Sequence, residues 1–218
     1  MPRKTFHEEL KELRSEIMHM GEFVIASVKK AVKALVEGDL ELADEVIKDD
    51  DVVDNYNLKI EESAMSMLAR QAPVARDLRL IHSVLFITVH LERIGDLALN
   101  IAEIAKRIKE LTAEEKDLVK LFLKMGSLGC DLVSKSLEAF DKRDVALAEK
   151  IKNLDEPIDQ LYKQFLKELR KCREEEDYLD RFTQLILASR YLERVADHAV
   201  DIAERIGFLV SGDWRELV

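Results

Sequence analysis

The sequence has 218 residues, 47% hydrophobic and 36% charged, enough for one sizeable core or two smaller related ones. Its net charge of −10 argues against nucleic acid as a main partner, because phosphate backbones bind basic surfaces. Two cysteines are too few for a disulfide framework and fit a reducing compartment. No apolar run approaches the ~18 residues of a membrane span, so we expect a cytoplasmic protein that could reach the inner membrane face through partners.

Long helices are predicted throughout the first half, because glycine and proline are scarce. Apolar residues at three-four spacing predict a helix over residues 5–36 that ends at a glycine. Asp39 is placed to cap a second helix that runs to residue 70, where Gln71-Ala72-Pro73 breaks it. A third helix is expected over residues 76–109. Three long helices with short loops predict an antiparallel bundle over residues 1–110.

The second half, residues 111–218, predicts a second bundle of the same kind, which makes the fold all-α with six long helices. Residues 112–115 read as a capping box for a fourth helix. Asp144 is placed to cap a fifth helix, in which Pro157 should cause a kink or a restart. A sixth helix is expected over residues 177–209, followed by a short tail. Trp214 in this tail is expected to be an anchor, with an intersubunit contact as the alternative.

Internal duplication is the strongest signal in the sequence. The stretch LERIGDLALNIAE, residues 91–103, returns as LERVADHAVDIAE at an offset of 101 residues. Around the second and fifth helices the offset is 105, so Asp50 and Asp54 recur as Asp155 and Asp159. No Ser-, Gly- or Pro-rich linker separates the halves, so we expect the two bundles to pack on each other.

Acidic residues form a column along each copy of the repeated stretch, opposite its apolar stripe. Like charges four residues apart cost a helix ~0.2–0.5 kcal/mol per pair, so each column favours a bound cation. With the acidic pair on the preceding helix, each column can bring four carboxylates together, and hard or borderline metal ions take such oxygen ligands. The first column comprises Glu92, Asp96 and Asn100, joined by the pair Asp50 and Asp54; the second comprises Glu193, Asp197 and Asp201, joined by the pair Asp155 and Asp159.

Ordinary helix-surface electrostatics is the alternative, with Arg93 paired to Asp96 and Arg194 paired to Asp197. A di-iron oxidase is not indicated, because no Glu-x-x-His occurs. The histidines, among them His90, are expected to be packing or surface residues, with His198 alone near a column. No catalytic serine, cysteine or phosphate-binding loop is visible, so we expect no enzyme.

The stretches AVKALVEGDLELADEVIKDDDVVD, RQAPVARDLRLI, LERIGDLALNIAE and LERVADHAVDIAE resemble the PhoU family of phosphate transport and phosphate-signalling regulators. The resemblance covers about residues 5–210 and implies two three-helix bundles related by pseudo-twofold symmetry. It implies acidic motifs that hold multinuclear metal clusters, often iron or zinc, on the outer surface. The candidate metal ligands that it implies are Asp50, Asp54, Glu92, Asp96 and Asn100 in the first copy, and Asp155, Asp159, Glu193, Asp197 and Asp201 in the second. Asn100 departs from a full carboxylate set, which predicts a weaker or smaller first cluster.

The same resemblance implies a homodimeric adaptor, not an enzyme, that contacts the ATPase of a phosphate ABC transporter and a sensor histidine kinase. Two alternatives stay open. A metal-dependent hydrolase would need a general acid or base near open coordination positions, for which His198 is the one nearby candidate. A metal-free helical scaffold would present the acids as a docking surface.

Overall fold

The computed structural model of the chain describes residues 2–108, 115–152, 154–171 and 178–213. Within these residues all regular structure is helical: α1 (Pro2–Glu37), α2 (Leu40–Gln71), α3 (Ala75–Ile108), α4 (Lys116–Lys142), α5 (Val145–Ile151), α6 (Glu156–Leu169) and α7 (Tyr178–Ser211). The all-α fold predicted from the sequence is confirmed. The predictions for Thr112 and Trp214 concern positions outside the described residues.

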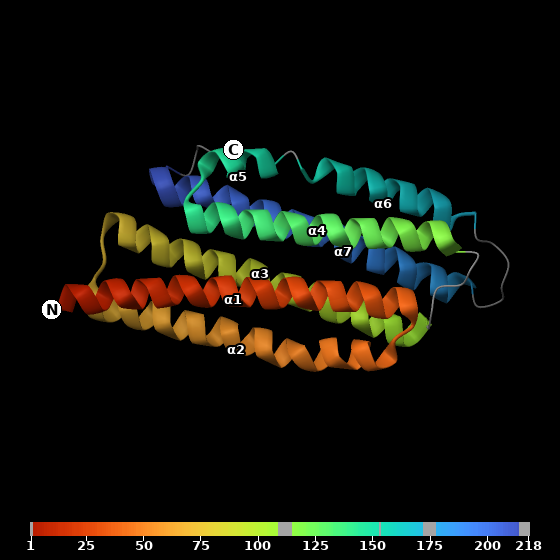
Figure 1. The fold of residues 1–218 in the computed structure, drawn as a ribbon, viewed down its shortest axis with the longest axis horizontal. Helices are drawn as coiled ribbons and strands as arrows, with labels where there is room; N and C mark the ends of the chain where they lie inside the picture. The colour runs from red at the N-terminus through yellow and green to blue at the C-terminus, as the bar shows by residue number, and fades with distance from the viewer. Residues whose placement is uncertain (1, 109–114, 153, 172–177, 214–218) are drawn as a thin grey trace.

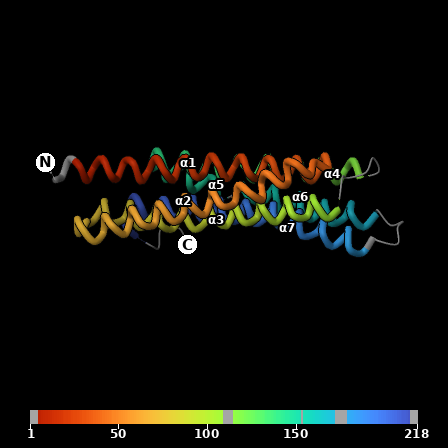
Figure 2. Tube along the Cα trace, turned by 90° about the horizontal axis from the view of Figure 1, so that it is seen from below, coloured from red at the N-terminus to blue at the C-terminus, as the bar shows by residue number. Residues whose placement is uncertain are grey.

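Two bundles lie side by side along the long axis of the molecule (Figure 1). In the first, α1, α2 and α3 pack on one another; in the second, α4 and α7 pack with α5 and α6. The bundles meet through α1 against α4 and through α3 against α7. Figure 2 shows α1 along one side of the molecule and α3 along the other. The α1–α4 contact therefore lies in one layer of the molecule and the α3–α7 contact in the other. The helices α2 and α5–α6 lie at opposite edges (Figure 1).

The predicted fifth helix is two helices, which makes seven in the described part of the chain rather than six. Pro157 lies in the first turn of α6, where its missing N–H costs nothing and its fixed φ favours a helix start. The Leu154 N–H donates to the carbonyl of Ile151, which turns the chain between α5 and α6. The sequence predicted a kink or restart at this proline, and the structure has the restart.

Glycines let α1 and α4 approach closely, in a pattern that repeats the duplication. Gly21 of α1 faces the side chain of Leu137, and a Cβ there would overlap it. Gly126 of α4 faces Val32, and a Cβ there would lie 2.8 Å from a Val32 methyl carbon. Because both members of one pair are 105 residues from their counterparts in the other, this contact obeys the pseudo-twofold axis.

The helix ends confirm most of the predicted caps and correct one. The side chains of Asp39 and Asp144 accept hydrogen bonds of 2.9 and 3.0 Å from the N–H groups three residues on. Glu115, expected as the third helical residue of a capping box, is instead the N-cap of α4 and makes no side-chain cap. Its carboxylate binds Arg181 of α7 at 2.6 Å, because pairing with this guanidinium satisfies a nearly buried charge.

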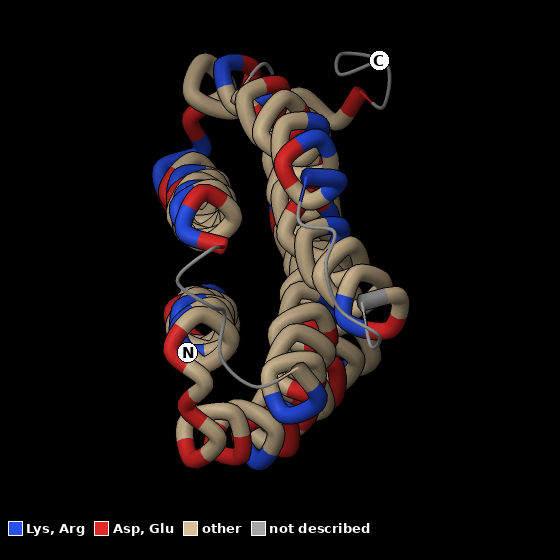
Figure 3. The backbone as a smooth tube through the Cα atoms, turned by 90° about the vertical axis from the view of Figure 1, so that its right-hand side faces the viewer, with Lys and Arg blue, Asp and Glu red and all other residues tan. Residues whose placement is uncertain are grey.

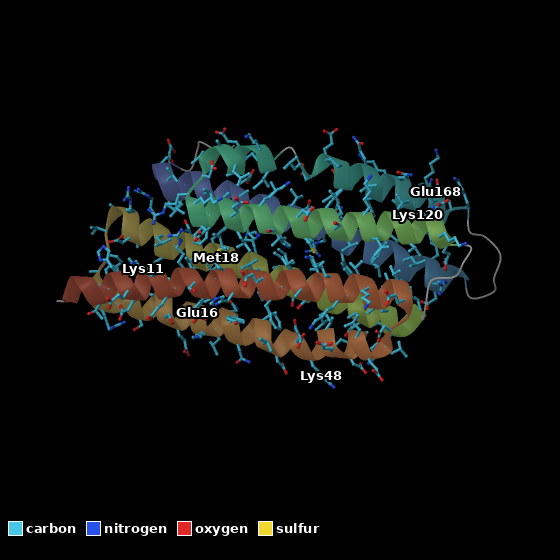
Figure 4. All side chains as sticks on the ribbon, viewed as in Figure 1. Lys11, Glu16, Met18, Lys48, Lys120 and Glu168 are labelled. Atoms are coloured by element: carbon cyan, nitrogen blue, oxygen red, sulfur yellow. The ribbon has the colours of Figure 1, made fainter. Side chains whose placement is uncertain are left out.

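Charge covers the outside of the molecule. Figure 3, viewed along the helices, shows acidic and basic residues on almost every helix, and Figure 4 labels Lys48 of α2 and Glu168 of α6 at opposite edges. None of the described helices is long and apolar enough to cross a membrane.

Candidate metal centre

The first acid column lies where α2 meets α3. Burial raises the pKa of Asp50 above its ordinary 3.8, and the charges of Asp54 and Asp96 raise it further. The pKa of Glu92 is also raised by burial, then by Asp96, with weaker contributions from Asp54 and Asp50. These carboxylates therefore share one patch, and their mutual repulsion favours proton or metal-ion binding.

The second acid column lies between α6 and α7 and is more buried than the sequence predicted. Glu193, expected to face outward, is only 8% exposed. Burial raises its pKa, and the charges of Asp197 and Asp159 raise it further. Its Oε2 atom is buried without a hydrogen-bond partner among the described residues. Asp159, rather than Asp155 at the N-cap of α6, is the α6 carboxylate whose charge acts on Glu193 and Asp197.

Arginine occupies part of each column. Arg93 lies 3.6 Å from a Glu92 oxygen and 3.4 Å from an Asp96 oxygen, the second contact as predicted. In the second column Arg190 pairs with Glu193. The predicted pair of Arg194 with Asp197 is wrong: it is not among the ion pairs of the described residues, where the arginine that pairs in this column is Arg190, one turn earlier on α7.

The side chain of the last residue of each column contacts a group other than the column's carboxylates. The side-chain amide of Asn100 donates to the backbone carbonyl of Asp96 at 2.6 Å. The Asp201 carboxylate lies 3.3 Å from His90 Nδ1 and 3.6 Å from His198 Nδ1. These histidines hold its pKa well below the ordinary range by hydrogen bonding, with His198 contributing first. Asp201 thus belongs to a histidine cluster between α3 and α7.

A family model described as PhoU domain matches residues 17–105 and again residues 122–206. The chain belongs to the PhoU family. It is 34% identical to a "Phosphate-specific transport system accessory protein PhoU homolog" of Clostridium acetobutylicum, over 100% of this chain and 99% of that protein. It is 36% identical to the homolog of the same name from Pseudomonas aeruginosa, over 96% of this chain and 86% of that protein.

Solved PhoU structures share the fold. The crystal structure of PhoU from Pseudomonas aeruginosa superposes with a TM-score of 0.87 at 36% identity, covering 95% of this chain and 100% of that one. The phosphate transport system regulatory protein PhoU from Streptococcus pneumoniae gives 0.86 at 31% identity, covering 98% and 99%. Two tandem bundles are therefore an arrangement that this chain has in common with other PhoU proteins.

The two columns of this PhoU chain differ from a closed metal site in one respect. Among the described residues, neither column gathers three ligand atoms within 4.8 Å of one another, whereas His90, His198 and Asp201 do. A metal in a column would therefore draw carboxylates from two helices inward. Sequence reasoning placed Asp201 in a column and His90 outside any site. The i,i+3 spacing of His198 and Asp201 was the available signal, since it places both on one helix face.

Proposed function

We propose that this chain is a regulatory accessory protein of phosphate transport whose two acid columns bind metal and serve as docking surfaces. Full-length similarity to proteins named as phosphate-specific transport system accessory proteins supports the regulatory role. The observation that carries the metal proposal is the same in both bundles: carboxylates from two helices crowd together, and burial and like charge raise their pKa values. A bound cation would neutralise this repulsion.

The metal would be iron or zinc, and each column would hold either one ion or a multinuclear cluster. In the first column Asp50, Asp54, Glu92 and Asp96 would hold it, with Asn100 available if it leaves the Asp96 carbonyl. In the second, Asp155, Asp159, Glu193 and Asp197 would hold it. Because each set joins two helices, metal would stiffen the pair and reduce the local negative charge. Occupancy would then tune partner binding.

The role we propose is an adaptor without catalysis. Its partners would be the ATPase of a phosphate ABC transporter and a sensor histidine kinase. The chain would bind them in the cytoplasm, as a homodimer. A hydrolase would need a free general acid or base beside the metal, and His198 is engaged with Asp201 and His90.

The first test is elemental analysis after identical reconstitution and washing of wild type, Glu92→Gln/Asp96→Asn and Glu193→Gln/Asp197→Asn. We expect each double variant to lose the metal of the column that it disables and to keep that of the other column. The charge-matched control is Glu61→Gln/Glu62→Gln, at exposed positions of α2, which should lose none. Pull-down of the ATPase and the kinase with loaded and chelated protein then tests whether metal affects docking. Equal metal in all four proteins would refute the columns as sites.

A metal-free acidic docking surface is the second candidate, and one observation favours it. Arg93 and Arg190 already neutralise part of each column, so the protein has built-in cations where a metal would sit. A basic partner segment could replace these arginines without any metal. Under this hypothesis the column variants weaken partner binding equally with and without a chelator, and high salt weakens it further.

A further inference from the structure

A compact group of three possible metal ligands lies where the two bundles meet. His90 comes from α3, and His198 and Asp201 come from α7, three residues apart on one face. The α3–α7 contact joins the halves of the molecule. Each histidine side chain is mostly buried, with 16% and 17% exposed, while Asp201 is 44% exposed. The group is therefore shielded on the histidine side and open to solvent on the aspartate side.

The spacing of the three ligand atoms fits a metal ion. His90 Nδ1 and His198 Nδ1 are 3.2 Å apart, and the Asp201 Oδ2 atom lies 3.3 and 3.6 Å from them. Zinc bonds of 2.0–2.2 Å at tetrahedral angles separate neighbouring ligand atoms by roughly 3.3–3.5 Å. The three atoms thus form a nearly equilateral triangle of the size of one tetrahedral face.

The contacts of the imidazole rings direct their Nδ1 atoms toward the carboxylate. The Nε2 atom of His198 is buried without a hydrogen-bond partner among the described residues, so Nδ1 carries its polar contacts. The His90 ring packs on Phe86, with the ring centroids 4.4 Å apart. The two Nδ1 atoms and the carboxylate therefore converge on one point, lined on one side by an aromatic ring.

The duplication did not produce a second copy of this group. At the offset of 101 residues, His90 corresponds to Tyr191, and His198 and Asp201 correspond to Leu97 and Asn100. Leucine cannot bind a metal, so the symmetry-related position lacks an equivalent ligand set. The histidine group is thus a property of one side of the α3–α7 contact, and it differs in chemistry from the all-oxygen columns.

We propose that His90, His198 and Asp201 bind one zinc-type divalent ion at the junction of the two bundles, separate from the acid columns. Two imidazoles and one carboxylate favour zinc or cobalt over the calcium and magnesium that all-oxygen sites take. Three protein ligands leave a fourth position for water, on the side where Asp201 is exposed. Because the ligands come from both bundles, the ion fastens one bundle to the other.

Cobalt titration tests the site, because tetrahedral Co²⁺ absorbs visible light far more strongly than six-coordinate Co²⁺. The metal-free protein is titrated with Co²⁺ and then with Zn²⁺ as competitor. We expect one equivalent of strongly absorbing Co²⁺ in wild type, displaced by Zn²⁺. His198→Gln and His90→Gln should lose this absorption and weaken zinc binding at least ~100-fold, the upper end of the loss from removing a supporting residue.

The matched controls are Glu92→Gln/Asp96→Asn and Glu193→Gln/Asp197→Asn, which should keep the strong absorption whether or not the columns bind metal. Strong absorption that survives in His198→Gln, or that is absent from wild type, would overturn the proposal. Imidazole NMR of wild type with one equivalent of Zn²⁺ covers the case in which the histidine variants misfold. His90 and His198 signals should shift while those of His7 and His19, which are on α1 and outside the group, do not; unmoved His90 and His198 signals would also overturn it.

Discussion

Gly95 of α3 lies directly against Val53 of α2: a Cβ on the glycine would be 3.0 Å from a Val53 methyl carbon. Val53 is next in the chain to Asp54, and Gly95 is next to Asp96. The close approach of the two backbones therefore brings the acidic pairs of α2 and α3 into one patch. A helix-interior glycine costs about 1 kcal/mol relative to alanine, and this packing accounts for its presence.

Replacing Gly95 by valine should push α2 away from α3. We expect a loss of ~1–3 kcal/mol in the free energy of unfolding, typical of overpacking, and weaker metal binding by the first column. Urea unfolding and metal analysis measure the two effects. Val53→Ala in the same chain should restore part of both, because it makes room for the new side chain. If Gly95→Val lowers stability and the second substitution restores nothing, the close approach is not what the glycine serves.

Local signals in the sequence were sufficient for the helices but not for the arrangement of the sites. Asp39 and Asp144 cap helices as predicted, because an N-cap depends only on residues within one turn. Grouping of Asp50 and Asp54 with Glu92 and Asp96 followed from matching spacings on adjacent helices. The contact of Asp201 with His90 could not be predicted in this way, because it depends on the α3–α7 packing between the bundles.

The duplication was a reliable guide to backbone and a poor guide to side-chain partners. It predicted two equivalent arginine–aspartate pairs, yet in the second copy the ion pair is between Arg190 and Glu193. The residue that corresponds to Arg190 in the first copy is Val89, so comparing the copies gives no hint of this ion pair. The 8% exposure of Glu193 likewise depends on the helices packed against α7, which only the folded chain specifies.

The two N-cap aspartates offer a direct test of equivalence between the bundles. Asp39→Ala and Asp144→Ala each remove one hydrogen bond to a helix N-terminal N–H. We expect each to lower the free energy of unfolding by ~1 kcal/mol, the usual value of an N-cap. Asparagine at either position, which keeps a cap acceptor, should retain most of the stability. Thermal unfolding followed by circular dichroism measures this; a loss as large with asparagine as with alanine would show that charge, not capping, matters.

The thiol of Cys130 should react slowly because it is buried on α4, beside α1 of the first bundle. Burial raises its pKa from 9.0 to about 11, and its Sγ atom lies 3.8 Å from the carbonyl of Ile25. At a pH between these two values, the thiol therefore keeps its proton in the folded state and loses it in the unfolded state. The stability that this contributes is complete below the ordinary pKa and is lost as pH rises through about 11.

Labelling kinetics of Cys130 test this in a Cys172→Ser background, where it is the one remaining thiol. Alkylation at neutral pH should be far slower than in urea-unfolded protein, since the thiolate is the nucleophile and the native fold disfavours it. The Cys130→Ala variant should also lose less stability than its parent as pH rises above the ordinary thiol pKa. Equal labelling rates in folded and unfolded protein would contradict the burial.

Arg190 and a metal ion should compete for Glu193. Replacing Arg190 by glutamine leaves a buried carboxylate without its cation, so the metal-free protein should lose ~1–3 kcal/mol of stability. The same change should raise the zinc affinity of the second column, because zinc no longer has to displace a guanidinium. Arg194→Gln, four residues along the same helix, is the matched control and should change neither quantity. Calorimetric zinc titration and urea unfolding measure both; a zinc affinity that falls in Arg190→Gln would mean that the arginine supports the site rather than competing for it.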